Sequence, residues 1–208
     1  MRAYVYVDGL NLFHRRLKGG PFKWLDLGKL CGLLMPVGHD VVAIKYFTAR
    51  VNPMPWDPSA PQRQDPYLAA LRTVPNLTIH TGQFKTRPKW MPLVRPCPHC
   101  GDKAEIWRTD EKGSDVALAT HLLVDAHENR YDVGWIISKD TDLRAAVNAA
   151  RHVFRKKVGI VIPEPTGGLN LFDADYYEHI RDSSLKLTQF PPKVKAADKV
   201  IFKPKEWP

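Results

Sequence analysis

Aspartates follow two apolar segments of this sequence at the point where each segment ends. Residues 3–7 (AYVYV) run directly into Asp8, and residues 133–137 (VGWII) are followed closely by Asp140 and Asp142. Asp115 stands at the start of a helical pattern. Carboxylates that converge repel one another, and a hard ion such as Mg²⁺ or Mn²⁺ relieves this while leaving positions open for water and phosphate. We therefore expect these four aspartates to bind divalent metal, which suits hydrolysis of a phosphodiester.

Apolar segments that resemble buried strands alternate with helical patterns along much of the chain. We predict strands at 3–7, 41–51, 77–84, 104–109, 133–137 and 158–162, and helices at 11–18, 26–34, 67–73, 114–126, 141–150 and 173–180. This alternation predicts an α/β fold with a mostly parallel central sheet and helices on both faces. Ligands bind beyond the carboxyl ends of such strands, which places Asp8 and Asp140 at the functional edge. Asp115 and Asp142 also fit a second interpretation, as helix caps; Thr141 is the expected cap of the helix at 141–150.

Two stretches and the tail depart from this alternation. Residues 52–66 carry many prolines and are expected to be an irregular loop. We predict one domain over residues 1–185, which contains a basic insertion rich in proline and cysteine at about 86–103. Residues 186–208 are predicted to form an extended, basic, Pro-rich tail.

The composition favours a polyanionic partner and argues against a membrane protein. The 208 residues include 31 Lys and Arg against 22 Asp and Glu, a net charge of +9. Nucleic acid is the commonest partner for such an excess, although solubility alone would also explain it. Apolar runs long enough to cross a bilayer and a signal peptide are absent from the sequence. Its 3 cysteines, an odd number, provide no disulfide framework, so we expect a cytoplasmic protein.

Basic and aromatic side chains alternate in the insertion and before it. Lys85 and Arg87 are candidates for contact with a phosphate backbone, and Trp90 for stacking on an unpaired base. A solvated loop with Trp90 packed on its own domain fits equally well. Arg15 follows Asp8 closely and either flanks substrate or lies on an exposed helix face.

Cys97 and Cys100 have the spacing of half a zinc site. The sequence contains no second pair of this kind, so a complete Zn²⁺ site is not the favoured interpretation. A loop knuckle, or a site completed by a second chain, fits better. The second alternative leaves a homodimer open.

Three acidic motifs in this order resemble the NYN domain, a LabA-like branch of the PIN-like nucleases. They are Asp8-Gly-Leu-Asn11, Glu111-Lys-Gly-Ser-Asp115-Val and Ser138-Lys-Asp140-Thr-Asp142-Leu. The similarity continues almost to the end of the chain, at Lys203-Pro-Lys-Glu-Trp207. The resemblance implies a three-layer PIN-like sandwich with an acidic metal-binding pocket and, in active members, endoribonuclease activity.

The resemblance also implies roles for individual residues. Asp8, Asp115, Asp140 and Asp142 would be metal ligands or groups that position water. Asn11 would hydrogen-bond substrate or a ligand carboxylate, Ser138 and Thr141 would orient the pocket, and Lys112 would contact phosphate. Departures from the family pattern are Lys139 where many relatives have Gly, Leu143 where many have Phe, and His121 where many have Asp. Lys139 would either replace part of a metal's charge or bind phosphate, which leaves the number of metals open.

The function predicted from these observations is that of a metal-dependent endoribonuclease acting on single-stranded or structured RNA. Two other classes remain open. One is an RNA-binding NYN module with weak catalysis, and the other is a small-molecule enzyme, such as a pyridine-ring hydroxylase, on the same fold. The sequence has neither a Walker A motif nor a Gly-rich dinucleotide fingerprint.

Overall fold

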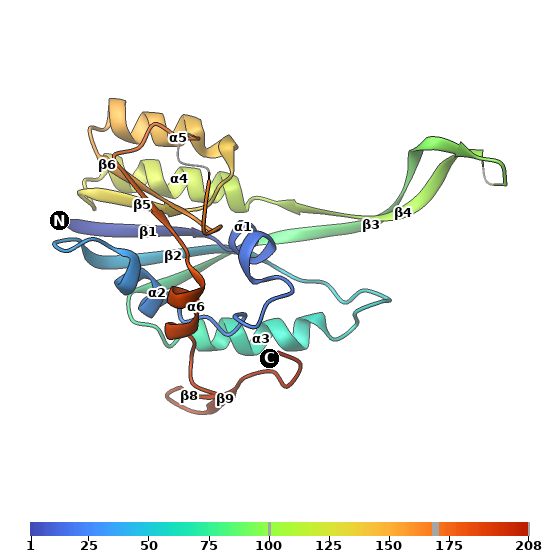
Figure 1. Cartoon of the computed structure of the whole chain (residues 1–208), viewed down its shortest axis with the longest axis horizontal. Coiled ribbons are helices and arrows are strands. Elements are labelled where there is room, and N and C mark those ends of the chain that lie inside the picture. The colour runs from blue at the N-terminus through green and yellow to red at the C-terminus, as the bar shows by residue number, and fades with distance from the viewer. Residues whose placement is uncertain (100, 168–170, 208) are drawn as a thin grey trace.

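The computed structural model describes residues 1–99, 101–167 and 171–207 and contains a central seven-stranded sheet (Figure 1). The strand order is β4-β3-β2-β1-β5-β6-β7, and every neighbouring pair is parallel except β3 with β4. The strands are β1 (Arg2–Asp8), β2 (Asp40–Arg50), β3 (Leu77–Cys97), β4 (Gly101–Lys112), β5 (Val133–Ile137), β6 (Lys157–Ile162) and β7 (Tyr176–His179). The central strands β1, β5 and β6 are buried along almost their whole length, as their apolar sequences predict.

Helices cover both faces of the sheet. One face carries α4 (Ser114–His127) and α5 (Arg144–Asn148), and the opposite face carries α2 (Leu27–Leu34), α3 (Ala60–Leu71) and α6 (Asp182–Leu187). The short helix α1 (Gly9–Leu12) follows β1 and continues as a π-helical turn, Phe13–Leu17. Alternation along β1 supplies both cores, because Val5 and Val7 pack on one face and Tyr6 on the other. The predicted three-layer α/β sandwich is therefore confirmed.

The prediction of an irregular loop over residues 52–66 is wrong for its second half, because α3 begins at Ala60. Pro61 lies in the first turn, where the backbone N–H would have no helical partner in any case. The side chain of Gln64 anchors the helix to β2, since it donates to Ala49 O and accepts from the Val51 N–H. Burial of Leu68 and Leu71 adds apolar contacts that compensate for the hydrogen bond that Pro66 removes.

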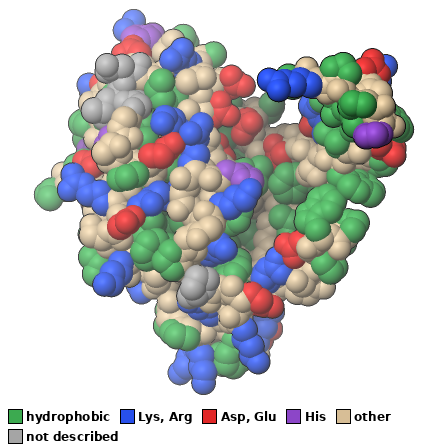
Figure 2. Space-filling view, turned by 45° about the vertical axis from the view of Figure 1, so that its right-hand side comes forward, with side chains coloured by type: hydrophobic (Ala, Val, Ile, Leu, Met, Phe, Trp, Pro, Cys, Tyr) green, Lys and Arg blue, Asp and Glu red, His purple; other side chains and the backbone are tan. Residues whose placement is uncertain are grey.

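The basic insertion is part of a long antiparallel hairpin. Strands β3 and β4 pair from Gln83 with Lys112 outward to Cys97 with Gly101. We call residues 84–111 the arm, because this part of the hairpin projects beyond the rest of the sheet (Figure 1). In the space-filling view the arm stands off the body, and basic and apolar side chains gather on it (Figure 2). The sequence does not predict this strand pairing, because prolines such as Pro88 and Pro92 have no N–H to donate to a neighbouring strand.

The predicted helix at residues 173–180 is wrong, because this segment forms the edge strand β7, parallel to β6. Asp175 fixes the start of the strand by accepting the Val158 N–H at 2.9 Å and side-chain donors from Arg151 and Lys157. The ring of Tyr176 stacks on Trp135 with the centroids 5.7 Å apart. These tertiary contacts outweigh the local helical pattern.

The tail is not simply extended. It forms the small hairpin of β8 (Lys193–Lys195) and β9 (Val200–Phe202), and its aromatic rings pack onto the body. The indole N–H of Trp24 donates to Pro191 O at 2.9 Å, while Phe190 and Trp207 contact the same indole ring. The tail therefore contributes to the core beneath α2 and α3. Within the described part of the chain, every helix is too short or too polar to cross a membrane.

Candidate functional site

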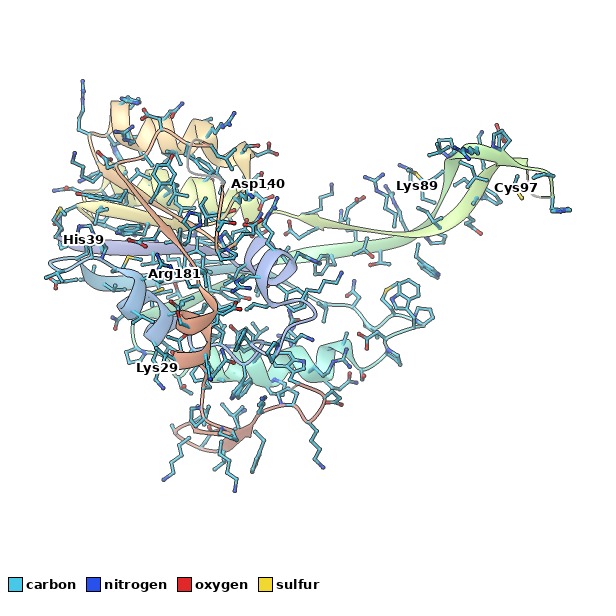
Figure 3. The ribbon with its side chains drawn as sticks, viewed as in Figure 1. Lys29, His39, Lys89, Cys97, Asp140 and Arg181 are labelled. Carbon is cyan, nitrogen blue, oxygen red and sulfur yellow. The ribbon has the colours of Figure 1, made fainter. Side chains whose placement is uncertain are left out.

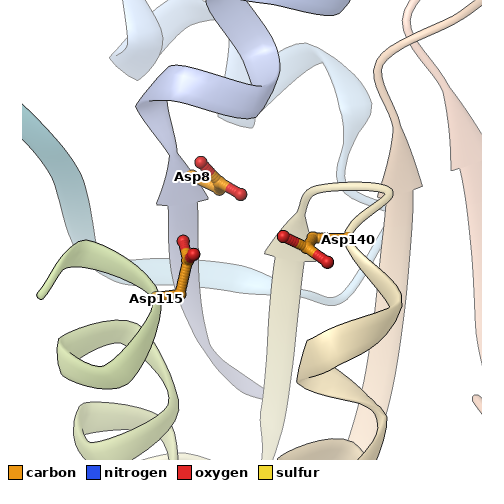
Figure 4. Close-up of side chains that lie close together, drawn as sticks. All are labelled: Asp8, Asp115 and Asp140. Carbon is orange, nitrogen blue, oxygen red and sulfur yellow. The ribbon is translucent and has the colours of Figure 1, made fainter. Parts of the chain in front are cut away.

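Three of the four predicted aspartates lie together at the carboxyl edge of the sheet (Figure 4). Asp8 ends β1, Asp140 follows the adjacent parallel strand β5, and Asp115 lies in the first turn of α4. One carboxylate oxygen from each lies within 4.8 Å of the others. The geometry therefore brings Asp8, Asp115 and Asp140 into one group, which we call the triad.

Asp8 is the buried member of the triad, with 3% of its surface exposed. Burial raises the pKa of Asp8 to about 6, and the nearby Asp115 and Asp140 add to this, while hydrogen bonds from the Asn11 N–H and the Ser138 hydroxyl oppose it. Burial also raises the pKa of Asp115, and so do Asp140 and Glu111. The negative charge is therefore held here at a cost, which a bound cation would offset.

The residues around the triad connect the ends of β1 and β5. Ser138 Oγ donates to Asp8 Oδ2 at 2.8 Å and accepts the Asp140 N–H at 3.0 Å. Asn11 donates its backbone N–H to Asp8 Oδ1 at 2.9 Å, while its side-chain oxygen accepts the Lys139 N–H at 3.1 Å. Hydrogen bonds of this kind, from groups that are not metal ligands themselves, fix the orientation of a carboxylate that binds metal.

Asp142 lies outside this group. Its side chain is exposed, and its backbone N–H donates to Asp140 Oδ1 at 3.0 Å. The prediction that Thr141 caps the helix is wrong, since Asp140 is the N-cap of the 3₁₀ turn Thr141–Leu143 that leads into α5. Asp140 is therefore both the cap of this turn and a member of the triad.

Glu111 and Glu164 are site residues that the sequence analysis missed. Glu111 Oε1 accepts the Ser114 N–H at 3.0 Å and so fixes the start of α4 just before Asp115. Glu164, which follows β6, accepts from Arg15 at 2.9 Å and lies 3.3 Å from Lys139 Nζ. Glu111 opens the second acidic motif but was given no role there, and Glu164 lies between two prolines, where no spacing pattern marks it.

Lys139 is therefore paired with a carboxylate. Burial alone would raise the pKa of Glu164, but hydrogen bonds from its own backbone, Arg15 and Lys139 prevail and lower it. The negative charge of Glu164 thus offsets part of the positive charge of Arg15 and Lys139. The second oxygen of Glu164, Oε2, is buried and has no hydrogen-bond partner among the described residues.

The arm separates the basic and aromatic side chains that the sequence analysis grouped together. Alternation and pairing register place Lys85 and Arg87 on one face of the hairpin with Arg108, and Trp90 on the other face with Trp107. Trp90 is 63% exposed, so it is not packed on its own domain, whereas the Trp107 ring contacts Trp56. Lys112 is exposed where the arm joins α4.

The tip of the arm carries the proposed zinc ligands. Cys97 ends β3, and both Cys97 and Lys89 lie along the arm well away from Asp140 (Figure 3). Cys100 lies outside the described residues, so the interpretation of this pair as half a zinc site stays a prediction.

The donor chemistry of the triad fits a hard divalent ion. All three groups are carboxylates, the ligand type that Mg²⁺ and Mn²⁺ prefer, and few enough to leave coordination positions for water and phosphate. The raised pKa of Asp8 gives a physical reason for a cation at this point. Residues Asp8, Asp115 and Asp140 would hold such an ion.

Comparisons with known proteins agree with the fold. A 6-hydroxy-3-succinoylpyridine 3-monooxygenase from Pseudomonas putida is 27% identical over 238 aligned positions, which cover 100% of this chain and 75% of the relative. A crystal structure of a protein of unknown function from Vibrio parahaemolyticus superposes with a TM-score of 0.53 at 18% identity, covering 87% of this chain and 93% of that one, and so shares its fold. The NYN domain family matches residues 2–180. This chain is a member of the NYN domain family, with an acidic triad at the carboxyl edge of its sheet.

Proposed function

We propose that this protein is a metal-dependent endoribonuclease that hydrolyses RNA phosphodiester bonds at the triad. The observation that carries the proposal is the convergence of Asp8, Asp115 and Asp140 within 4.8 Å of one another. Membership of the NYN domain family, a branch of the PIN-like nucleases, supports a hydrolase of nuclease type. The net charge of +9 supports a polyanionic substrate.

Each residue near the triad has a role in this proposal. Asp8, Asp115 and Asp140 hold Mg²⁺ or Mn²⁺, which when bound lowers the pKa of a water and stabilises charge on the phosphate. Ser138 and the backbone of Asn11 keep Asp8 in position. Exposed Asp142 orients water from the solvent side, with Thr141 beside it.

Basic residues of the arm and its root extend the substrate path away from the triad. Lys112 lies between the arm and the helix that carries Asp115, and Lys85 and Arg87 continue along one face of the hairpin. These cations contact the phosphates of RNA that is single-stranded or structured. Lys139 and Arg15 share Glu164 and reach phosphate when that carboxylate releases them.

Cleavage of labelled RNA tests the nuclease proposal. We expect wild-type protein to cleave with Mg²⁺ or Mn²⁺ and not with EDTA, and Asp8→Asn and Asp140→Asn to lose the activity. Asp198→Asn, an exposed aspartate in the tail, is the matched control and retains it. Equal cleavage by wild type and both triad variants would identify a contaminating nuclease and refute the assignment.

A second candidate function follows from the relative that is named a monooxygenase, because its alignment covers the full length of this chain. In this alternative one oxygen atom of O₂ is added to the ring of a small pyridine derivative, and the other leaves as water with two electrons from an external reductant. Substrate-dependent O₂ consumption in the presence of a nicotinamide reductant, without RNA cleavage, would select it. Salt-sensitive RNA binding with no turnover under any divalent ion would instead select an RNA-binding module with weak catalysis.

A further inference from the structure

A second polar cluster, outside the triad, joins the helix that carries Asp115 to β1 and β2. Lys45 Nζ donates to Asp125 Oδ2 at 2.5 Å and lies 3.2 Å from His121 Nδ1. The Tyr6 hydroxyl donates to the same oxygen of Asp125 at 2.8 Å. The side chain of Lys45 is 11% exposed and that of Asp125 is fully buried. This costly buried ion pair needs a structural reason.

Burial and Lys45 keep two neighbouring imidazoles neutral, although Asp125 favours their charged forms. An ammonium group only donates hydrogen bonds, so Lys45 donates to His121 Nδ1, and the proton of His121 is on Nε2. Burial lowers the pKa of His121, and Lys45 lowers it further. Burial, His121 and Lys45 together lower the pKa of His80, whose ring centroid is 4.2 Å from that of His121. At neutral pH this pair therefore presents flat, uncharged aromatic rings.

His80 is the outer member of an aromatic stack that runs across the sheet. Phe47 and His80 are register partners on β2 and β3, and their rings lie parallel within 15° with centroids 4.8 Å apart. The other face of His80 points away from Phe47, toward the outer side of β3. Within the described part of the chain, residues 77–82 of β3 have no strand on that side, because β4 pairs only from Gln83 onward.

The same edge of β3 offers unpaired backbone groups. Ile44 donates its N–H to Asn76 O. In a parallel pair, every second residue of a strand directs both its N–H and its C=O to the same neighbouring strand. The even-numbered residues of this stretch therefore pair with β2. Ile79 and Thr81 direct their N–H and C=O groups outward, beside the free face of His80.

A cavity of about 550 Å³ occupies this edge. It is lined by Ile79, His80, Thr81, Gly82, Gln83, Lys112, Gly113, Ser114 and Ala117. Ser114 immediately precedes Asp115, so the cavity adjoins the helix turn that carries this member of the triad. Its volume lies within the range of small-molecule sites.

We propose that this cavity binds a nitrogen-containing heteroaromatic ring, stacked on His80 as the third member of the Phe47–His80 stack. The nitrogen and oxygen atoms on the edge of the ring pair with the outward backbone groups of Ile79 and Thr81. A nucleobase of a nucleotide and a free pyridine derivative share this chemistry. The site goes beyond the nuclease proposal and does not depend on it, because binding needs neither the triad nor a metal.

Histidine NMR of the full chain in EDTA tests the proposal without turnover. The probes are adenosine 5′-monophosphate, uridine 5′-monophosphate and pyridine-3-carboxylate, with ribose 5-phosphate as the ligand that lacks a ring. We expect the ring protons of His80 and His121, assigned from His80→Phe and His121→Gln, to shift with at least one aromatic probe and not with ribose 5-phosphate. Shifts with nucleotides alone assign the site to a nucleobase, and shifts with pyridine-3-carboxylate alone assign it to a small heterocycle.

Substitutions separate stacking from a general effect on folding. His80→Ala should weaken binding of the aromatic probe about tenfold, the scale of one base–aromatic stack. His80→Phe keeps a flat ring and should retain most of the affinity. His127→Ala changes an exposed histidine at the end of α4, the helix that carries His121, and is the matched control. Equal shifts with ribose 5-phosphate, no shift with any probe, or equal loss in His80→Phe and His80→Ala would overturn the proposal.

Discussion

The Ser138 hydroxyl donates a 2.8 Å hydrogen bond to Asp8 Oδ2 and thereby ties the end of β5 to the end of β1. The same oxygen of Ser138 accepts the Asp140 N–H, so one buried serine contacts the carboxylate of Asp8 and the backbone of Asp140. We therefore expect metal affinity at this site to depend on a residue that carries no charge.

Ser138→Ala should weaken Mn²⁺ binding about tenfold without removing any carboxylate, because loss of an outer hydrogen bond to a metal ligand has that scale. Isothermal titration with Mn²⁺ measures the effect. Ser183→Ala, at an exposed position in α6, is the control and should bind like wild type. An unchanged affinity in Ser138→Ala would show that Asp8 needs no such support.

Asp8→Asn should make the metal-free protein more stable at pH 7.5. The pKa of Asp8 is raised from 3.8 to about 6, so the stability contributed by its neutral form is fully present below pH 3.8 and is lost as the pH rises through 6. At one pKa unit per 1.36 kcal/mol, the variant gains up to about 3 kcal/mol above pH 6 and almost nothing near pH 4. Urea unfolding in EDTA across this range measures the difference. A variant that is less stable than wild type at pH 7.5 contradicts the prediction.

Asp142 and Asp140 should behave differently although the sequence pattern treats them alike. Asp140→Asn removes a ligand of the triad and should abolish tight Mn²⁺ binding, while Asp142→Asn should change the Mn²⁺ affinity by less than about threefold, because Asp142 is exposed and outside the triad. Mn²⁺ titrations of the two variants give the comparison. Equal loss of affinity in both would place Asp142 among the ligands.

The sequence is informative where a local pattern and the fold agree. The apolar runs before Asp8 and Asp140 predicted two strands of a mostly parallel sheet. The structure places these strands side by side and parallel, so both side chains lie at one edge. The role of Asp142 could not be separated from that of Asp140, because the sequence does not show which of two aspartates two positions apart is the helix cap. Glu164 lies 149 positions from its partner Arg15, and Asp125 lies 80 positions from Lys45. No local sequence pattern predicts either pair.

Lys45→Met should destabilise the protein by about 1–3 kcal/mol, because the buried carboxylate of Asp125 loses its ammonium partner but keeps Arg130 and the Tyr6 hydroxyl. The double variant Lys45→Met/Asp125→Leu removes both charges and should recover part of this loss. Urea unfolding of wild type, the two single variants and the double variant gives the coupling energy. A double variant whose loss equals the sum of the single losses would show that the two side chains act independently.

The two faces of the arm should contribute differently to RNA binding. Lys85→Ala and Arg87→Ala remove charges from the basic face, so each should lower affinity and reduce the slope of log affinity against log salt by about 1. Trp90→Ala lies on the opposite face and should leave that salt slope unchanged, since a stacking contact releases no counterion. Fluorescence anisotropy of a labelled RNA, measured over a salt series with Asp140→Asn protein to prevent cleavage, separates the two effects. If Lys85→Ala and Trp90→Ala reduce the salt slope equally, RNA wraps both faces of the hairpin and the basic face alone does not define its path.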